Sequence, residues 1–184
     1  MIPEAVIAML ACGRIGIIHS VVFGGFASNE LASRIDDSKA KILITASCGF
    51  EPGRTVEYRP LVDGALKLAK HSVEKVIFFQ RKNHEVKLNA PKEISWDEAL
   101  SNAKETDCVE MKSNEYAYIL YTSGTTGKAK GVIRDHEGYY FLSAITSIEL
   151  KINMNDKALL VMPLCHANSF NFFCAYVFAG ASIY

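Results

Sequence analysis

The chain has 184 residues, 20 Lys and Arg against 20 Asp and Glu, and 49% hydrophobic residues, which excludes a disordered chain and allows a sizeable core. Zero net charge argues against a dedicated nucleic-acid-binding protein, which carries a basic excess. No apolar run is long enough to cross a bilayer, and the start, Met1 to Glu4, lacks the features of a signal peptide. The five cysteines are scattered without a CxxC pair, so we expect free thiols in a reducing compartment and no metal motif.

Helical and strand patterns alternate along the first half of the chain. Pro3 suits the first turn of a helix that ends near Gly13. The β-branched and apolar residues of 42–45 favour a strand, and apolar residues at helical spacing follow Pro60. In chain order we expect a helix over 4–12, a strand over 17–23, a helix over 29–35, a strand over 41–46, a helix over 60–70 and a strand over 75–80.

The second half continues this alternation after a more polar stretch, residues 81–111, which we interpret as a surface excursion. Ser95 and Glu98 have the spacing of a capping box, so a helix is expected to begin there. We then expect a strand over 116–121, a helix over 139–150, a strand over 158–162, a helix over 168–178 and a strand-like run over 181–184. His19, inside the strand expected over 17–23, is interpreted as a buried structural histidine.

Strands separated by helices favour parallel pairing. The sequence therefore predicts an α/β fold in layers, with a mostly parallel sheet and helices on both faces. No internal repeat or low-complexity linker is present, which favours one continuous domain. Met1 lies almost within a helix and Tyr184 within an apolar run, whereas complete domains usually end in surface segments. We therefore expect the chain to be a fragment.

A glycine-rich segment follows the strand expected over 116–121. Residues 121–131 read YTSGTTGKAKG, with three glycines, four Ser and Thr hydroxyls and two lysines. Backbone N–H groups in such a turn form an anion-binding nest, and the hydroxyls and lysines would add bonds to a phosphate. Only Thr125 and Thr126 separate Gly124 from Gly127, which is too short for the Walker A loop of P-loop NTPases. The alternative is a flexible surface turn rich in small polar residues.

This segment resembles the phosphate-loop signature of the adenylate-forming superfamily, which includes acyl-CoA synthetases, luciferases and the adenylation domains of peptide synthetases. Ala129 replaces the proline that usually precedes the second lysine. The resemblance implies that the loop binds the β- and γ-phosphates of ATP while a carboxylate attacks the α-phosphate. The residues that fall on the family pattern are Thr122, Ser123, Gly124, Thr125, Thr126, Gly127 and Lys130.

The first 134 residues resemble the short-chain branch of that superfamily, the acetyl- and propionyl-CoA synthetases, through segments such as 9–12, 14–16, 23–27 and 34–47. Glu51, Pro52, Gly53 and Arg54 fall where those enzymes carry a short loop that binds coenzyme A. Pro52 and Gly53 favour a tight turn, and the planar guanidinium of Arg54 suits a phosphate. The alternative is that Arg54 is a solvated surface charge paired with Glu51 or Glu57.

Beyond about Arg134 the resemblance changes. Residues 162–169, which read MPLCHANS, resemble the Pro-Leu-x-His segment that borders the acyl site of medium- and long-chain acyl-CoA synthetases and other acyl ligases. The resemblance implies that His166 lies beside the carboxylate, where an imidazole could hydrogen-bond an acyl or α-phosphate oxygen. The alternative is a histidine at a helix start whose ring nitrogens form hydrogen bonds with the local backbone.

Together these resemblances imply an AMP-forming carboxylate–CoA ligase that activates a short-chain carboxylate such as acetate or propionate, with ATP, Mg²⁺ and coenzyme A as ligands and no metal held by the protein alone. We expect residues 1–184 to be part of its N-terminal AMP-binding domain, without the C-terminal domain that carries the catalytic lysine, and inactive by themselves. A cytoplasmic or mitochondrial-matrix location fits reduced cysteines. The alternatives are a medium- or long-chain acyl-CoA ligase and a non-catalytic nucleotide-binding module.

Overall fold

The computed structural model describes residues 2–122 and 129–184. Their contacts form two compact units, although the sequence favoured one continuous domain. The sheet unit comprises Gly24–Thr106, and the aromatic unit comprises Met1–Phe23 with Asp107–Tyr184. The chain passes between the units twice, and residues 103–110, which include the second boundary, are all exposed and belong to no helix or strand. Such a polar stretch buries little side-chain surface, so the contacts concentrate on either side of it.

The sheet unit is built on a three-stranded parallel sheet in the order β1 (Ile42–Ala46), β4 (Lys75–Phe79), β5 (Glu93–Ser95). Helices α2 (Ser28–Ser38) and α3 (Tyr58–Leu68) pack against each other and share one core cluster with β4. In β4 the alternate residues Val76 and Phe78 enter this cluster and are 0% exposed. The short helix α4 (Trp96–Ser101) follows β5, and the Ser95 hydroxyl accepts a hydrogen bond from the Glu98 N–H at 3.0 Å, as the capping spacing predicted.

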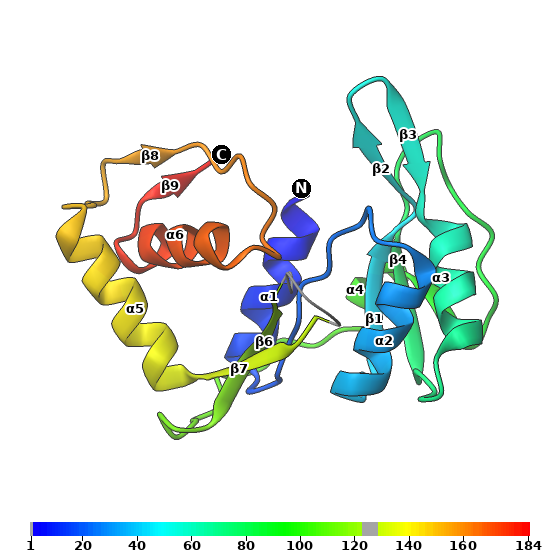
Figure 1. The fold of residues 1–184 in the computed structure, drawn as a ribbon, viewed down its shortest axis with the longest axis horizontal. Helices are drawn as coiled ribbons and strands as arrows, with labels where there is room; N and C mark the ends of the chain where they lie inside the picture. Colours follow the sequence, from blue (N-terminus) through cyan, green and yellow to red (C-terminus); the bar gives the residue numbers. More distant parts are fainter. Residues whose placement is uncertain (1, 123–128) are drawn as a thin grey trace. The chain divides into compact units, whose positions relative to one another are not determined.

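An antiparallel ribbon follows the carboxyl end of β1 in the same unit. It consists of β2 (Cys48–Glu51) and β3 (Arg54–Glu57), joined by the two-residue turn Pro52–Gly53. Figure 1 shows this ribbon projecting past the start of α3. Gly53 has φ +77°, a value that glycine adopts without strain and that the second central residue of a type II turn requires. The predicted tight turn is therefore confirmed.

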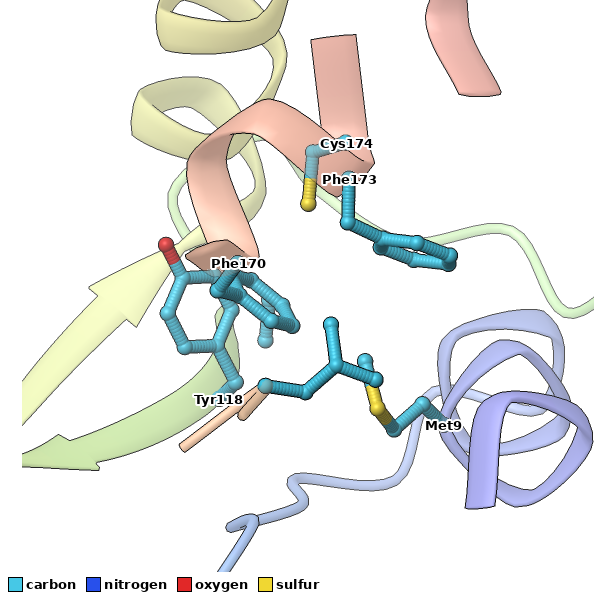
Figure 2. Close-up of a cluster of buried hydrophobic side chains, with 7 residues drawn as sticks. Met9, Tyr118, Phe170, Phe173 and Cys174 are labelled. Atoms are coloured by element: carbon cyan, nitrogen blue, oxygen red, sulfur yellow. The ribbon is translucent and has the colours of Figure 1, made fainter. Parts of the chain in front are cut away.

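The aromatic unit contains α1 (Pro3–Arg14), the antiparallel pair β6 (Tyr116–Tyr121) and β7 (Gly131–Asp135), and α5 (His136–Glu149) packed on α6 (Ala167–Phe178). The short strands β8 (Lys157–Ala158) and β9 (Ser182–Ile183) pair in parallel. Figure 2 shows side chains from α1, β6 and α6 meeting in the core. The rings of Tyr118 and Phe170 lie 4.5 Å apart between centroids and hold β6 against α6.

Two expected strands are shorter than the sequence indicated. In residues 17–23 only His19 pairs, through a parallel bridge to Tyr118, so this apolar run is extended without being a strand. The strand expected over 158–162 is limited to β8, after which the Leu160 N–H still donates to the Tyr184 carbonyl at 2.9 Å. Local apolar patterns predict burial, whereas a strand also needs a backbone partner along its whole length.

The helices agree with the sequence more closely, and the largest difference at a helix start is that of α5. Helix α5 begins three residues before the expected start because Asp135 caps it, accepting a hydrogen bond from the Gly138 N–H at 2.8 Å. In the described ranges no helix has the length and apolar character needed to cross a membrane.

Candidate functional site

The base of the glycine-rich segment is closed by the β6–β7 pair. Tyr121 lies opposite Gly131, and the next pair outward is Thr122 and Lys130. The Thr122 N–H donates to the Lys130 carbonyl at 3.0 Å, and the Lys130 N–H donates to Thr122 Oγ1 at 3.4 Å. The segment is thus the connection of a hairpin, whose second strand the sequence analysis did not anticipate.

Thr122 and Lys130 are both exposed at the strand ends, where their side chains are accessible to a ligand. A lysine ammonium at this position is suited to a phosphate oxygen, because it is a compact charge with three donors. The other predicted phosphate-binding residues, Ser123, Gly124, Thr125, Thr126 and Gly127, lie outside the described residues.

His166 is the residue that precedes α6, and its side chain is exposed and makes no capping hydrogen bond. The segment around it is held by local contacts: the His166 N–H donates to the Pro163 carbonyl at 3.0 Å, and the Ser169 hydroxyl donates to the Met162 carbonyl at 2.6 Å. Leu164, 3% exposed, anchors the same segment in the core of the aromatic unit. The backbone of the Pro-Leu-x-His segment is therefore ordered while its imidazole remains accessible.

The predicted coenzyme A loop is the tip of the ribbon in the sheet unit. Arg54 pairs with Glu51 across the Pro52–Gly53 turn, with Nη2 2.6 Å and Nε 2.7 Å from Oε2. The Arg54 side chain is 71% exposed. This is the ion pair that the alternative interpretation anticipated, and it also leaves the guanidinium at a position that a phosphate can reach.

The other face of the ribbon borders a cavity that the sequence analysis missed. Phe50 is 56% exposed, with the Arg81 guanidinium 4.1 Å from its ring centroid and the His84 ring edge-on at 5.5 Å. The adjoining cavity has a volume of about 530 Å³ and is lined by Ser47, Cys48, Glu57, Arg59, Pro60, Asn83, His84, Glu85, Val86, Lys87 and Asn89. Its residues follow the carboxyl ends of β1 and β4, the edge where ligands bind in open α/β sheets.

Arg59, which lines that cavity, forms an ion pair with the buried Glu93 and a second one with Asp63. Arg59 Nη1 lies 2.6 Å from Glu93 Oε2, and Arg59 Nε lies 3.0 Å from Asp63 Oδ2. Glu93 Oε2 also accepts from the Asn89 N–H at 2.8 Å, so the pair holds the loop between β4 and β5. Only the Arg59–Asp63 spacing of four on one helix was visible in the sequence.

His19 agrees with its structural interpretation. Its ring lies 6.0 Å from that of Tyr118 and 6.2 Å from that of Phe170, and neither of its ring nitrogens has a hydrogen-bond partner among the described residues. Burial lowers the pKa of His19 to about 4, because the charged imidazolium loses its water. In residues 2–122 and 129–184, no three His, Cys, Asp or Glu side chains form a group that could hold a metal ion, and none of the five cysteines forms a disulfide.

The comparisons with known proteins agree with the chemistry of these segments. The family model described as AMP-binding enzyme matches residues 1–184. The chain belongs to this family. It is 55% identical over 140 residues to the Homo sapiens protein named acyl-CoA synthetase short-chain family member 3, mitochondrial. The aligned region covers 76% of this chain and 20% of that relative. It is 42% identical over 149 residues to the acetyl-coenzyme A synthetase of Xylella fastidiosa, covering 79% of this chain and 23% of that relative.

The chain thus spans about a fifth of the length of these curated relatives of the AMP-binding family. The structure brings Thr122 and Lys130 together in one unit, and Glu51 and Arg54 together in the other. The glycine-rich segment of residues 121–131, whose ends pair in β6 and β7, has three glycines, four Ser and Thr hydroxyls and two lysines, the composition of an anion-binding nest.

Proposed function

We propose that this chain is part of an AMP-forming ligase that joins a short-chain carboxylate, such as acetate or propionate, to coenzyme A. A carboxylate oxygen attacks the α-phosphorus of ATP, the α–β phosphoanhydride bond breaks, and pyrophosphate leaves. The thiol sulfur of coenzyme A then attacks the acyl carbon, loses its proton, and displaces AMP to give the thioester. Membership in the AMP-binding enzyme family, together with relatives named as short-chain acyl-CoA and acetyl-CoA synthetases, is the observation that carries this proposal.

Thr122, Lys130 and the intervening residues Ser123, Gly124, Thr125, Thr126 and Gly127 bind the phosphates of ATP in this proposal. The hydrogen bonds between Thr122 and Lys130 support it, because they hold the two ends of this glycine-, hydroxyl- and lysine-rich segment together, and such a composition suits an anion. Charge repulsion between carboxylate and triphosphate is the main barrier, so preorganised donors act electrostatically. Mg²⁺ enters this scheme as the metal complex of the substrate ATP.

Coenzyme A binds at the ribbon tip, Glu51–Arg54, where one of its phosphates forms an ion pair with the Arg54 guanidinium. The exposure of this side chain supports the assignment. His166 stands beside the carboxylate in the proposed acyl site, and its accessible imidazole on an ordered segment supports that role. Residues 1–184 are then part of the N-terminal AMP-binding domain, and a C-terminal domain supplies the catalytic lysine. The mitochondrial relative and the lack of disulfides among the described cysteines support a mitochondrial-matrix or cytoplasmic location.

A medium- or long-chain acyl-CoA ligase is the second candidate. The observation that favours it is the Pro163–His166 segment, which resembles the acyl-site border of those enzymes and is ordered by Leu164 and Ser169. Both candidates share the same adenylation step and differ only in the length of the acyl group that the site accepts.

Carboxylate-dependent exchange of radiolabelled pyrophosphate into ATP tests the first half-reaction in the complete ligase that carries this segment. We expect exchange with acetate or propionate in the absence of coenzyme A, and thioester formation when it is added. Binding of ATP without exchange under any carboxylate would instead assign the segment to a non-catalytic nucleotide-binding module.

A further inference from the structure

The hydroxyl of Tyr58 lies between two glycines that come from different segments. One is Gly24, in the loop before α2, and the other is Gly49, in strand β2. A Cβ placed on Gly49 would lie 2.6 Å from Tyr58 Cζ and 3.2 Å from Cε1, and closer still to the hydroxyl oxygen. A Cβ on Gly24 would meet the same three atoms. Both positions therefore require glycine because one tyrosine occupies the space.

Tyr58 is also fixed to the sheet. It is the first residue of α3, and its N–H donates to the Ser47 carbonyl at 3.0 Å, immediately before β2 begins. Burial raises the pKa of the Tyr58 phenol, and the Glu51 carboxylate raises it further, so the hydroxyl stays neutral. A neutral, half-buried ring on a helix end is a rigid spacer with two side-chain torsions.

The register of the ribbon places this contact beneath the Glu51–Arg54 pair. Side chains alternate between the two faces of a strand, so Gly49 and Glu51 share a face. Gly49 lies opposite Val56 and Glu51 lies opposite Arg54, which places Arg54 on that face as well. The other face carries Phe50, on which the Arg81 guanidinium stacks at 4.1 Å. The ribbon is therefore supported on both faces near its base while its tip is exposed.

We propose that Tyr58 is a positioning residue for coenzyme A: by filling the space between Gly24 and Gly49 it sets the angle of the ribbon, and so the place where Arg54 meets the coenzyme A phosphate. This rests on the proposed function of the ribbon tip. Tyr58 itself does not touch the ligand. Loss of the ring would let the ribbon tilt, and a displacement of about 1 Å at a binding group is enough to weaken a reaction step severely.

The test compares Tyr58→Leu, Gly49→Ala and the double variant in the complete ligase. Leucine keeps an apolar side chain but lacks the outer ring atoms and the hydroxyl that fill the space beside Gly49. Tyr58→Leu therefore leaves room for a methyl group on residue 49. Each single substitution is expected to raise KM for coenzyme A about fivefold or more, with pyrophosphate exchange within about twofold of the wild type. Because the two residues are in contact, the double variant is expected to be no worse than the poorer single variant.

Two further variants complete the experiment. Tyr58→Phe removes only the hydroxyl and is expected to fold with a smaller rise in KM for coenzyme A. Tyr116→Leu, at a tyrosine that is 56% exposed in the other unit, is the matched control and should change neither half-reaction. An unchanged KM for coenzyme A in folded Tyr58→Leu would overturn the proposal, as would a parallel loss of exchange and thioester formation, which would indicate a general structural role.

Arg54→Ala in the same assay distinguishes the positioning role of Tyr58 from the coenzyme A site on which that role rests. If Arg54→Ala raises KM for coenzyme A and Tyr58→Leu does not, only the positioning role of Tyr58 is wrong. If Arg54→Ala has no effect on KM for coenzyme A, the ribbon is not a coenzyme A site and both proposals are wrong.

Discussion

Arg54 and Glu51 form an ion pair across the Pro52–Gly53 turn, with Arg54 Nη2 2.6 Å from Glu51 Oε2. Exposed pairs of this kind contribute only about 0.2–1 kcal/mol to stability, because water competes for both charges. A phosphate dianion is a stronger partner for a guanidinium than one carboxylate. The pair therefore leaves Arg54 available for exchange from Glu51 to a ligand, which connects the ribbon tip to its proposed function.

Arg54→Ala is expected to raise KM for coenzyme A about tenfold, the effect of losing about 1.4 kcal/mol of charge-assisted hydrogen bonding. Pyrophosphate exchange should be nearly unchanged, because Arg54 would contact coenzyme A and not ATP. Steady-state thioester formation and exchange, measured on the same preparation, check the two expectations. Lys67→Ala, which removes an exposed cation of α3, is the control. Equal damage to both half-reactions would indicate a structural role for Arg54.

Glu51→Gln should act in the opposite direction. The amide keeps the size of the side chain but removes the negative charge that holds Arg54 and repels a phosphate. We expect KM for coenzyme A to fall about two- to fivefold, with most of the gain lost in concentrated salt, which screens exposed charges. A rise in KM would mean that Glu51 orients Arg54 for binding and does not compete with the ligand.

Lys130→Ala tests the phosphate loop. Lys130 is exposed next to the loop base, so its side chain contributes little packing, and its loss should affect ATP use far more than stability. Pyrophosphate exchange is expected to fall at least about tenfold, equivalent to about 1.4 kcal/mol of transition-state stabilisation. Lys104→Ala, at another exposed lysine, should leave exchange unchanged. A folded Lys130→Ala protein with full exchange would refute the phosphate-binding role.

The sequence predicted those elements whose signals are local. The β-branched and apolar run of 42–45 gave β1, and the run at 75–79 gave β4, each within one residue of the expected bounds. The capping spacing of Ser95 and Glu98 and the Pro52–Gly53 turn were also confirmed. These features depend on neighbours in the chain, which a sequence displays directly.

Features that depend on distant partners were missed or misjudged. The apolar run at 17–23 is not a strand because it pairs with β6 at one residue only. Nothing in the sequence indicated that β7 would pair with β6, that Glu93 would meet Arg59 across 34 positions, or that Tyr58 would fill the space above Gly49. Only the fold shows which side chain requires the glycines at positions 24 and 49.

Glu93→Gln is expected to destabilise the chain by about 2 kcal/mol at neutral pH, because the neutral amide that replaces the buried carboxylate is a weaker acceptor for Arg59 and the Asn89 N–H. Burial alone would raise the pKa of Glu93, but hydrogen bonds from Arg59 and Asn89 together hold it below its ordinary value of 4.5. A lowered pKa stabilises the folded state above the unfolded value, and this gain is lost as pH falls through the folded value.

The urea midpoint of the chain as a function of pH measures this contribution. The wild type should lose its advantage over Glu93→Gln below about pH 4.5, where the unfolded carboxyl begins to take up its proton. Glu74→Gln, which changes an exposed carboxylate, should give a midpoint close to that of the wild type. A constant difference between wild type and Glu93→Gln down to strongly acidic pH would show that the Glu93 charge contributes nothing.

The length of the acyl group decides between the two ligase candidates. Each methylene that a pocket accepts contributes about 0.8 kcal/mol, or about fourfold in affinity, whereas overpacking a closed pocket costs about 1–3 kcal/mol. The relatives named as short-chain acyl-CoA and acetyl-CoA synthetases favour a closed pocket, and the ordered Pro163–His166 segment favours a roomier one. We expect kcat/KM across linear C2 to C10 carboxylates to be highest at acetate or propionate and to fall steeply beyond. In a closed pocket, each further carbon must displace the side chains that line it. A rate that still climbs at hexanoate would assign the protein to the medium- or long-chain ligases, with residues 162–169 as the part of this chain that reads acyl length.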